Sequence, residues 1–259
     1  MNNVNLILPA AGLGSRFQQV GESRPKPLIP VFDIPMIMWV LLNFPLNVSD
    51  KVWIISQKKD VIPPLLSNFI SKFPFAIQFL EIDGLTDGPA STVHLVLKSL
   101  PDNESVIVAN TDQFVFTDLS PFVESVRSGG ADGQIVTMRA SSNAWSYVGR
   151  DSTGAIDSVV EKIEISDEAT VGIYGWTSTR DAKEAFSHTF EQNLRTNNEF
   201  YVAPTYNFMI KNGKKIETYL VGDHGVAVHG LGTPKDLSAF LDHPAAKTSA
   251  LHFADILGL

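Results

Sequence analysis

The chain has 259 residues, of which 44% are apolar and 19% charged, so it is long enough for one large α/β domain or two small ones. Its net charge of −8 argues against nucleic-acid and anionic-membrane partners, because both require a basic protein face. The absence of cysteine excludes disulfide frameworks, thiolate zinc sites and cysteine nucleophiles.

No apolar run in the sequence approaches the roughly 18 residues that a membrane span needs. The N-terminus also lacks the basic and apolar regions of a signal peptide. We therefore expect a cytoplasmic protein.

Short apolar runs alternate with helical patterns through the first half of the chain. Several runs are apolar nearly throughout, as in strands that are buried on both faces of a parallel sheet. We predict strands at 5–10, 51–56, 76–82, 105–110 and 133–139, and helices near 36–44, 61–72, 90–99 and 119–128. This alternation predicts a layered α/β fold.

The second half is richer in strand patterns. Strands are predicted within 145–151, 156–165, 170–178 and 215–221, with a helix near 180–193. Thr233 is placed to cap a helix that begins at Pro234. No linker or repeat interrupts the chain, so we predict a single domain over residues 1–259.

The first strand leads into a glycine-rich turn, in the stretch LILPAAGLGSRF (6–17). Gly12 and Gly14 allow backbone N–H groups to approach an anion closely, and Arg16 adds a planar guanidinium that suits phosphate. A dinucleotide-binding GxGxxG motif is excluded by Phe17, and no Walker P-loop is present. From these residues alone, a purely structural turn with a surface arginine is an equal alternative.

A lysine between two prolines follows, in PKPLIPV (25–31). Pro25 and Pro27 hold the backbone around Lys26 extended and stiff, so little entropy is lost when the lysine meets a phosphate. Alone, Lys26 would be read as a solvated loop residue. Beside the glycine turn it indicates a phosphate site.

Together these motifs resemble the signature of the nucleoside-triphosphate:sugar-phosphate nucleotidyltransferases, also called nucleoside-diphosphate-sugar pyrophosphorylases. The similarity is closest to small transferases of bacterial capsule loci, several of which use CTP. Further matching segments are ANTDQFV (109–115), VVEKIEIS (159–166), TVGIYGW (170–176), NNEFYVAPTYN (197–207) and GLGTPKDL (230–237).

The resemblance implies a Rossmann-like GT-A-type fold and transfer of a nucleoside monophosphate, CMP from CTP in our prediction, to a phosphorylated acceptor for surface-polysaccharide synthesis. It implies that Arg16 binds the β- and γ-phosphates and the leaving pyrophosphate, and that Lys26 bridges the α-phosphate and the acceptor. Asp112 would be a Mg²⁺ ligand, with a turn-capping aspartate as the alternative.

The resemblance assigns the nucleotide to the part of the chain around 1–140 and the acceptor to 141–259. The backbone around the glycine turn and a second segment, GLTDGPASTVHLVL (84–97), would hold the base and ribose. The implied nucleotide-binding residues are Ala10, Ala11, Gly12, Gly14, Ser15, Gly88 and Ser91. Gly88 is expected to admit a flat base.

The acceptor-binding residues implied by the resemblance are Tyr147, Glu161, Lys162, Gly172 and Glu199. The alternative for Glu161 and Lys162 is a surface ion pair on a strand. Tyr147, Tyr201 and Trp145 are either pocket walls or core aromatics.

One position departs from the family pattern. Many relatives carry a second metal-binding aspartate shortly before the final Gly-Thr, whereas here the segment reads HGLGT, with Gly230 at that position. Asp223 and His229 are candidate substitutes, but His229 is better interpreted as a neutral pocket or core residue, since magnesium prefers oxygen ligands. The number of metal ions is therefore open.

Two other functions compete with this prediction. A GT-A glycosyltransferase would be expected to carry an Asp-x-Asp motif where this chain has NTD (110–112). A non-catalytic nucleotide-binding relative is favoured only by Gly230. The sequence does not indicate the oligomeric state, and the C-terminal segment ALHFADILGL (250–259) is expected to pack on the protein's own sheet.

Overall fold

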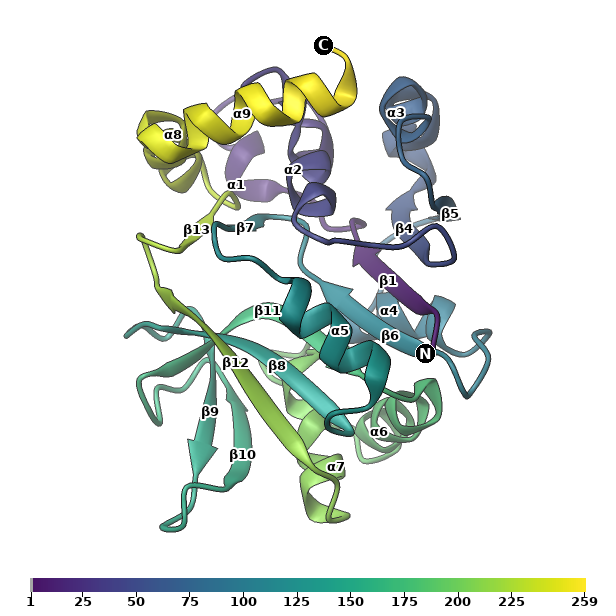
Figure 1. The fold of residues 1–259 in the computed structure, drawn as a ribbon, viewed down its shortest axis with the longest axis vertical. Helices are drawn as coiled ribbons and strands as arrows, with labels where there is room; N and C mark the ends of the chain where they lie inside the picture. Colours follow the sequence, from purple (N-terminus) through teal and green to yellow (C-terminus); the bar gives the residue numbers. More distant parts are fainter. Residues whose placement is uncertain (1) are drawn as a thin grey trace.

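The computed structural model describes residues 2–259, which form a nine-stranded mixed sheet with helices on both faces (Figure 1). The main path of the sheet is β10 (Ile156–Glu161), β9 (Ser146–Arg150), β11 (Glu168–Trp176), β6 (Ser105–Ala109), β1 (Val4–Pro9), β4 (Lys51–Gln57) and β5 (Ala76–Ile82). Off this path, β8 (Gly133–Arg139) pairs with β11 and with β12 (Ile216–Asp223).

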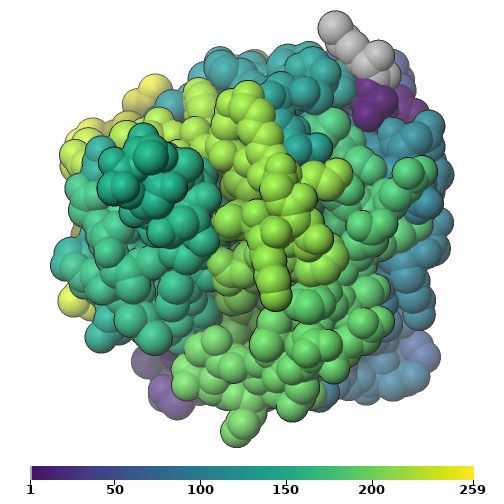
Figure 2. Space-filling model, turned by 90° about the horizontal axis from the view of Figure 1, so that it is seen from below, coloured from purple at the N-terminus to yellow at the C-terminus, as the bar shows by residue number. Residues whose placement is uncertain are grey.

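The predicted strands of the first half are confirmed, and β6, β1, β4 and β5 are mutually parallel. The sheet becomes mixed at β11, which runs antiparallel to both β6 and β8. The predicted α/β class is therefore confirmed, with parallel strands at the centre and antiparallel strands in the second half. In the view of Figure 2 the second half of the chain, in green to yellow-green, makes up much of the molecular face.

Residues on opposite sides of β1 contribute to two apolar clusters. Leu6 and Leu8 belong to one cluster and Ile7 to the other, as the two-residue period of a strand requires. The helices are α1 (Ser15–Gln18), α2 (Met36–Leu42), α3 (Ile62–Ile70), α4 (Pro89–Leu97), α5 (Ser120–Ser128), α6 (Thr179–Glu191), α7 (Tyr206–Lys211), α8 (Pro234–Asp242) and α9 (Pro244–Leu257). None of these helices, within residues 2–259, is long and apolar enough to cross a membrane.

Two short strands bring distant segments together beside the main sheet. Strand β13 (Val228–Gly230) pairs antiparallel with β7 (Gln113–Val115), so that Gly230 lies opposite Gln113. The chain that follows β13 therefore lies against the chain that follows β6. A second small hairpin joins β2 (Pro30–Val31) to β3 (Ile34–Pro35).

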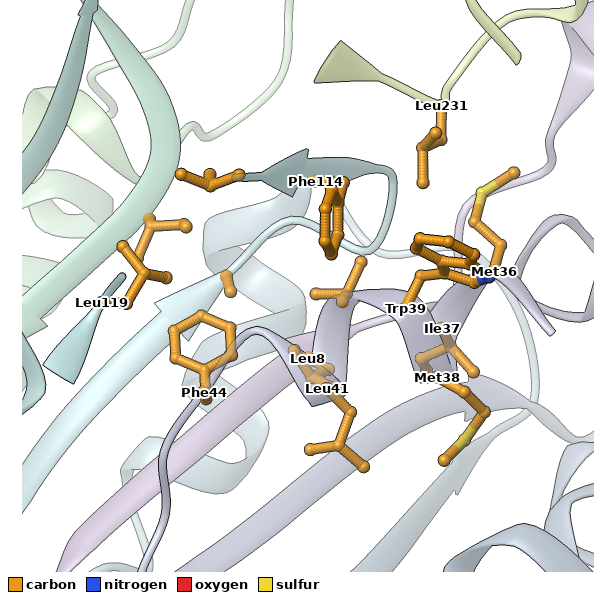
Figure 3. Packing of buried hydrophobic residues seen from close by; sticks show 14 of the residues in the cluster. Leu8, Met36, Ile37, Met38, Trp39, Leu41, Phe44, Phe114, Leu119 and Leu231 are labelled. Atoms are coloured by element: carbon orange, nitrogen blue, oxygen red, sulfur yellow. The ribbon is translucent and has the colours of Figure 1, made fainter. Parts of the chain in front are cut away.

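Trp39 of α2 lies near Phe114 in a buried apolar cluster (Figure 3), and the C-terminal helices pack on this cluster. The ring of Phe253 on α9 lies 5.0 Å from that of Trp39 and 5.9 Å from that of Phe114. The C-terminal segment thus packs within its own chain, as preferred over packing on a second subunit, and it covers α2 and the small β7–β13 sheet rather than the nine-stranded sheet.

A buried ion pair that the sequence did not reveal joins the chain before β4 to helix α5. Arg127 and Asp50 are 4% and 1% exposed, and two N–H···O bonds of 2.8 and 2.7 Å connect them. Burial alone would raise the pKa of Asp50, but the bonds donated by Arg127 and by the N–H groups of Val4 and Asn47 lower it overall. The carboxylate is therefore fully paired.

We predict that Asp50→Ala lowers the free energy of unfolding by about 3–5 kcal/mol, because Arg127 is left buried without a counter-charge. Chemical denaturation measures this loss. Asp83→Ala, which breaks the exposed Asp83–Lys58 pair, is the control and should have no measurable effect. An equal effect of both substitutions would contradict the assigned importance of the buried pair.

Candidate active site

A cavity of about 900 Å³ opens where β1 and β6 end, between the two halves of the chain. Carboxyl ends of parallel strands are the usual position of ligand sites in α/β sheets. The cavity is lined by Arg16 and Asp112 from the first half and by Glu161, Lys162 and Gly172 from the second.

The β1–α1 loop is held rigidly at the rim of this region. Ala10 N–H donates to Ile55 O over 2.7 Å, and the side-chain amide of Gln57 donates to Ala11 O over 2.6 Å. A side chain at Gly12 would meet no atom within 4 Å, so the backbone here is open to an incoming group. Arg16 follows and lines the cavity, whereas the other predicted nucleotide-binding residues of this loop are not among its lining residues: Ala10, Ala11, Gly12, Gly14 and Ser15.

Gly14 is required for the placement of Lys26. Its φ is +64°, and a Cβ on it would lie 3.0 Å from the Cβ of Lys26. Lys26 opens a short 3₁₀ helix (Lys26–Leu28) and forms an ion pair with Asp112. The side chains of this pair are 22% and 25% exposed.

Asp112 is fixed by the chain that follows β13. Leu231 N–H donates to Asp112 O over 2.7 Å, and a side chain at Gly232 would collide with the Asp112 carboxylate. Asp112 thus pairs with Lys26 and lines the same cavity as Arg16, whereas Lys26 is not among the lining residues. Gly232, which sequence reasoning missed, is what leaves room for the carboxylate.

The opposite wall of the cavity carries a polar network. Glu161 is buried and accepts a hydrogen bond from the Ser146 hydroxyl. Burial raises the pKa of the Glu161 carboxyl, and the Ser146 bond and the charge of Lys162 only partly offset this. Lys162 has a φ of +59°, which is unusual for a residue with a side chain, and its amine hydrogen-bonds Tyr201.

Gly172 lies in an irregular stretch of β11 at the end of the cavity. The pairing with β8 shifts register between Thr170 and Tyr174, and Gly172 has a φ of +83°. A side chain here would collide with the amide of Asn110, and Asn110 N–H donates to Gly172 O over 2.9 Å. The bulge therefore makes room for Asn110 and Gln113, two further lining residues.

Two of the expected acceptor-binding residues do not line the cavity. Tyr147 is fully buried, and its hydroxyl donates to Ser142 O over 2.8 Å and accepts from Ser142 N–H over 2.7 Å. Tyr147 therefore holds the loop 141–145, which lines the cavity, through two hydrogen bonds to Ser142. Glu199 accepts a bond of 2.8 Å from the Tyr201 hydroxyl, and Tyr201 in turn lines the cavity.

Gly88 is needed for a contact with the chain around Phe200, and its approach to a base stays a prediction. Its φ is +123°, and a Cβ would lie 2.6 Å from Phe200 O and 2.7 Å from Phe200 N. Ala90 N–H donates to Phe200 O, and Phe200 N–H donates to Asp87 O. Backbone atoms of Phe200 fill the space that a side chain at Gly88 would take. The hydrogen bonds tie the start of α4 to the 199–202 segment. Ser91, in the same helix α4, does not line the cavity.

Neither expected substitute for the second metal ligand lines the cavity. Asp223 is exposed on β12, and His229 is buried with its ring 5.3 Å from that of Phe116. Burial lowers the pKa of His229. Residues 2–259 contain no cluster of three His, Cys, Asp or Glu side chains that could bind a metal by themselves.

We predict that Glu161→Gln stabilises the protein in neutral solution. A carboxyl whose pKa is raised by folding favours the folded state when protonated, and this contribution is lost as the pH rises through its folded-state pKa. Glutamine keeps the neutral form at every pH. The melting temperature of the variant should therefore exceed that of the wild type at about pH 8 and match it at about pH 4. A difference that is largest at low pH would contradict this.

We predict that Gly88→Ala lowers the free energy of unfolding by more than about 1 kcal/mol, because alanine tolerates neither the backbone conformation nor the contact with Phe200. The matched control is Gly84→Ala in the same segment, where no atom lies within 4 Å of the new methyl group. Thermal and chemical unfolding of both variants measure the effect. A tolerated Gly88→Ala would mean that the junction can shift.

Comparisons with known proteins find curated relatives of part of the chain. A stretch of 121 residues is 30% identical to the bifunctional protein GlmU of Methanocaldococcus jannaschii, covering 47% of this chain and 28% of that protein. A stretch of 139 residues is 29% identical to mannose-1-phosphate guanyltransferase of Gibberella zeae, covering 51% and 37%. The matched region thus spans well under half of either relative.

Solved structures share the fold over nearly the whole chain. The nucleoside-diphosphate-sugar pyrophosphorylase of Vibrio cholerae RC9 superposes with a TM-score of 0.71 at 24% identity, covering 92% of this chain and 100% of that one. A putative glucose-1-phosphate thymidylyltransferase of Bacillus anthracis gives a TM-score of 0.75 at 19% identity, with 95% of each chain covered. A family profile described as Nucleotidyl transferase matches residues 4–205. The chain belongs to this Nucleotidyl transferase family.

Proposed function

We propose that the protein transfers a nucleoside monophosphate from a nucleoside triphosphate to a small phosphorylated acceptor such as a sugar phosphate, with release of pyrophosphate. The observation that supports this most is that Arg16 and Asp112 line one cavity and that Asp112 forms an ion pair with Lys26. The other side carries Glu161 and Lys162, from a different part of the chain. Two charged walls across one cavity suit two phosphorylated substrates.

In the proposed reaction a phosphate oxygen of the acceptor attacks the α-phosphorus of the nucleotide. A new P–O bond forms as the bond to the β-phosphate breaks, and pyrophosphate leaves. The protein's task is to align the two phosphates and to neutralise the charge between them. Arg16 would contact the leaving phosphates, since its guanidinium lines the cavity.

Lys26 is the residue that we assign to the α-phosphate and the acceptor phosphate. Without substrates its amine neutralises Asp112. A bound nucleotide offers a stronger anionic partner, and Lys26 would exchange the carboxylate for phosphate oxygens. Asp112 would then be available for Mg²⁺, which when bound supplies positive charge to the phosphates.

The acceptor would lie against Glu161, Lys162 and Tyr201. A buried carboxylate with a single hydroxyl donor, Ser146, retains acceptor capacity for hydroxyl or amine hydrogens of a substrate. The amine of Lys162 stands beside it, 3.9 Å from Glu161 Oε1, and would bind the acceptor phosphate. Tyr147 positions this wall through Ser142.

CTP is the nucleotide that we propose first, and a surface-polysaccharide precursor is the product class. Both choices rest on the sequence resemblance to small capsule-locus transferases. The related proteins named above include guanylyl and thymidylyl transferases, so GTP, UTP and dTTP are the competing donors.

The proposal is tested by pyrophosphate release. The assay crosses CTP, UTP, dTTP, GTP and ATP with sugar-1-phosphates, glycerol-3-phosphate, phosphocholine and phosphorylated amino-acid amides, with and without Mg²⁺. Release with a specific pair supports nucleotidyl transfer. Transfer of sugar from a nucleotide sugar without pyrophosphate would instead identify a glycosyltransferase and overturn the proposal.

We predict that Lys26→Ala lowers kcat by at least about 10²–10³-fold, because a charge contact to the transferred phosphate is lost. The melting temperature should stay close to that of the wild type, since Lys26 and Asp112 are both partly exposed. Lys59→Ala, which removes an exposed cation elsewhere, is the matched control. Near-normal turnover in Lys26→Ala would refute the assigned role.

A further inference from the structure

Two glycines stand two residues apart at the end of β13: Gly230 is its last residue, and Gly232 follows it. Gly230 and Gly232 flank the buried Leu231, so in an extended chain their missing side chains point to the same side. Both glycines line the cavity. A carboxylate from another part of the chain occupies the side-chain space of Gly232, and a second carboxylate lies in contact distance of the side-chain position of Gly230.

The space at Gly232 is taken by Asp112, whose carboxylate a side chain there would strike. The space at Gly230 faces Asp236 of α8: a Cβ at Gly230 would lie 3.6 Å from Asp236 Oδ2 and 3.7 Å from its Cγ. A carboxylate therefore already stands beside the position where many relatives carry their second acidic residue. Asp223 and His229, the substitutes suggested by sequence, lie outside the cavity.

The side chain of Asp236 is held in place by Thr233, the N-cap residue of α8. Its N–H donates to Thr233 Oγ1 over 3.1 Å, and the Thr233 hydroxyl donates to Asp236 Oδ2 over 2.6 Å. Asp236 is otherwise exposed and lines the cavity with Asp112. The cap fixes the side chain while leaving carboxylate oxygen available, and oxygen is the ligand that magnesium prefers.

We propose that Asp236 supplies the second carboxylate of the metal site and replaces the aspartate that is missing at position 230. This inference rests on the proposed function, because it assigns the residues that hold the divalent cation of that reaction. Asp112 lies against Gly232 and Asp236 lies beside Gly230, so the two carboxylates would hold the cation from neighbouring positions, and phosphate oxygens would complete its ligands.

The test is the affinity for Mn²⁺ in the presence of inorganic pyrophosphate, measured as the loss of the free-ion EPR signal beyond the loss that the same pyrophosphate causes without protein. Pyrophosphate is a product with every donor base and every acceptor, so the result does not depend on the choice of CTP. We expect Asp236→Asn to weaken Mn²⁺ binding by at least about tenfold, which is the lower end of the loss seen for partners around a metal. Asp112→Asn should weaken it as well.

The helix cap provides the matched control. Thr233→Val removes the hydroxyl that bonds Asp236 but keeps the carboxylate. It should lower the melting temperature while retaining most of the Mn²⁺ affinity. The double variant Asp236→Asn/Gly230→Asp moves the carboxylate back to position 230 and should restore Mn²⁺ binding.

Three results would overturn the inference: wild-type protein that does not bind Mn²⁺ with pyrophosphate, Asp236→Asn protein that binds it normally, or a double variant without recovery. The proposed function fails separately. If the wild type releases pyrophosphate but Asp236→Asn leaves Mn²⁺ affinity unchanged, only this inference is lost. If Asp236→Asn loses Mn²⁺ but no donor and acceptor pair reacts in the wild type, the metal site stands and nucleotidyl transfer does not.

Discussion

The ion pair between Lys26 and Asp112 is the contact on which the arrangement of the candidate site depends. It joins the first connection after β1 to the end of β6, and each partner reaches its position because a glycine lies beneath it. Gly14 lets the loop approach the base of Lys26, and Gly232 leaves room for the carboxylate of Asp112. Both charges are thereby held at the cavity before any substrate binds, which reduces the ordering that binding must supply.

The two walls of the cavity come from different halves of the chain, and backbone contacts fix their relative position. The bulge at Gly172 is bonded to Asn110, and the chain after Gly88 is bonded to Phe200. Glycine is required at both places because other backbone or amide groups occupy the space of its side chain. A substrate on one wall therefore meets a second wall whose distance is set by the fold rather than by a flexible linker.

The fold was predictable where a single local signal decided it. The apolar runs of β1, β4 and β6 indicated buried parallel strands, as found. The segment Gly-Thr-Pro marked the cap of α8, which the bond from Asp236 N–H to Thr233 confirms. Contacts between distant residues left no such signal. The sequence around Asp50 and Arg127 does not predict their ion pair. The residues around Gly88 do not predict that the backbone of Phe200 fills the space beside it. Motifs indicated which residues gather at the site, but only the β7–β13 pairing shows which of them face each other.

The absence of a carboxylate at position 230 illustrates the same limit. A sequence motif is compared position by position, so the glycine at 230 is read as a missing metal ligand. In space, what matters is whether an oxygen ligand stands where the cation and phosphates meet, and the first turn of α8 brings Asp236 to that place. A Cβ at position 230 would lie in ordinary van der Waals contact with Asp236, so an aspartate six residues later along the chain places its carboxylate beside the position where the motif lacks one.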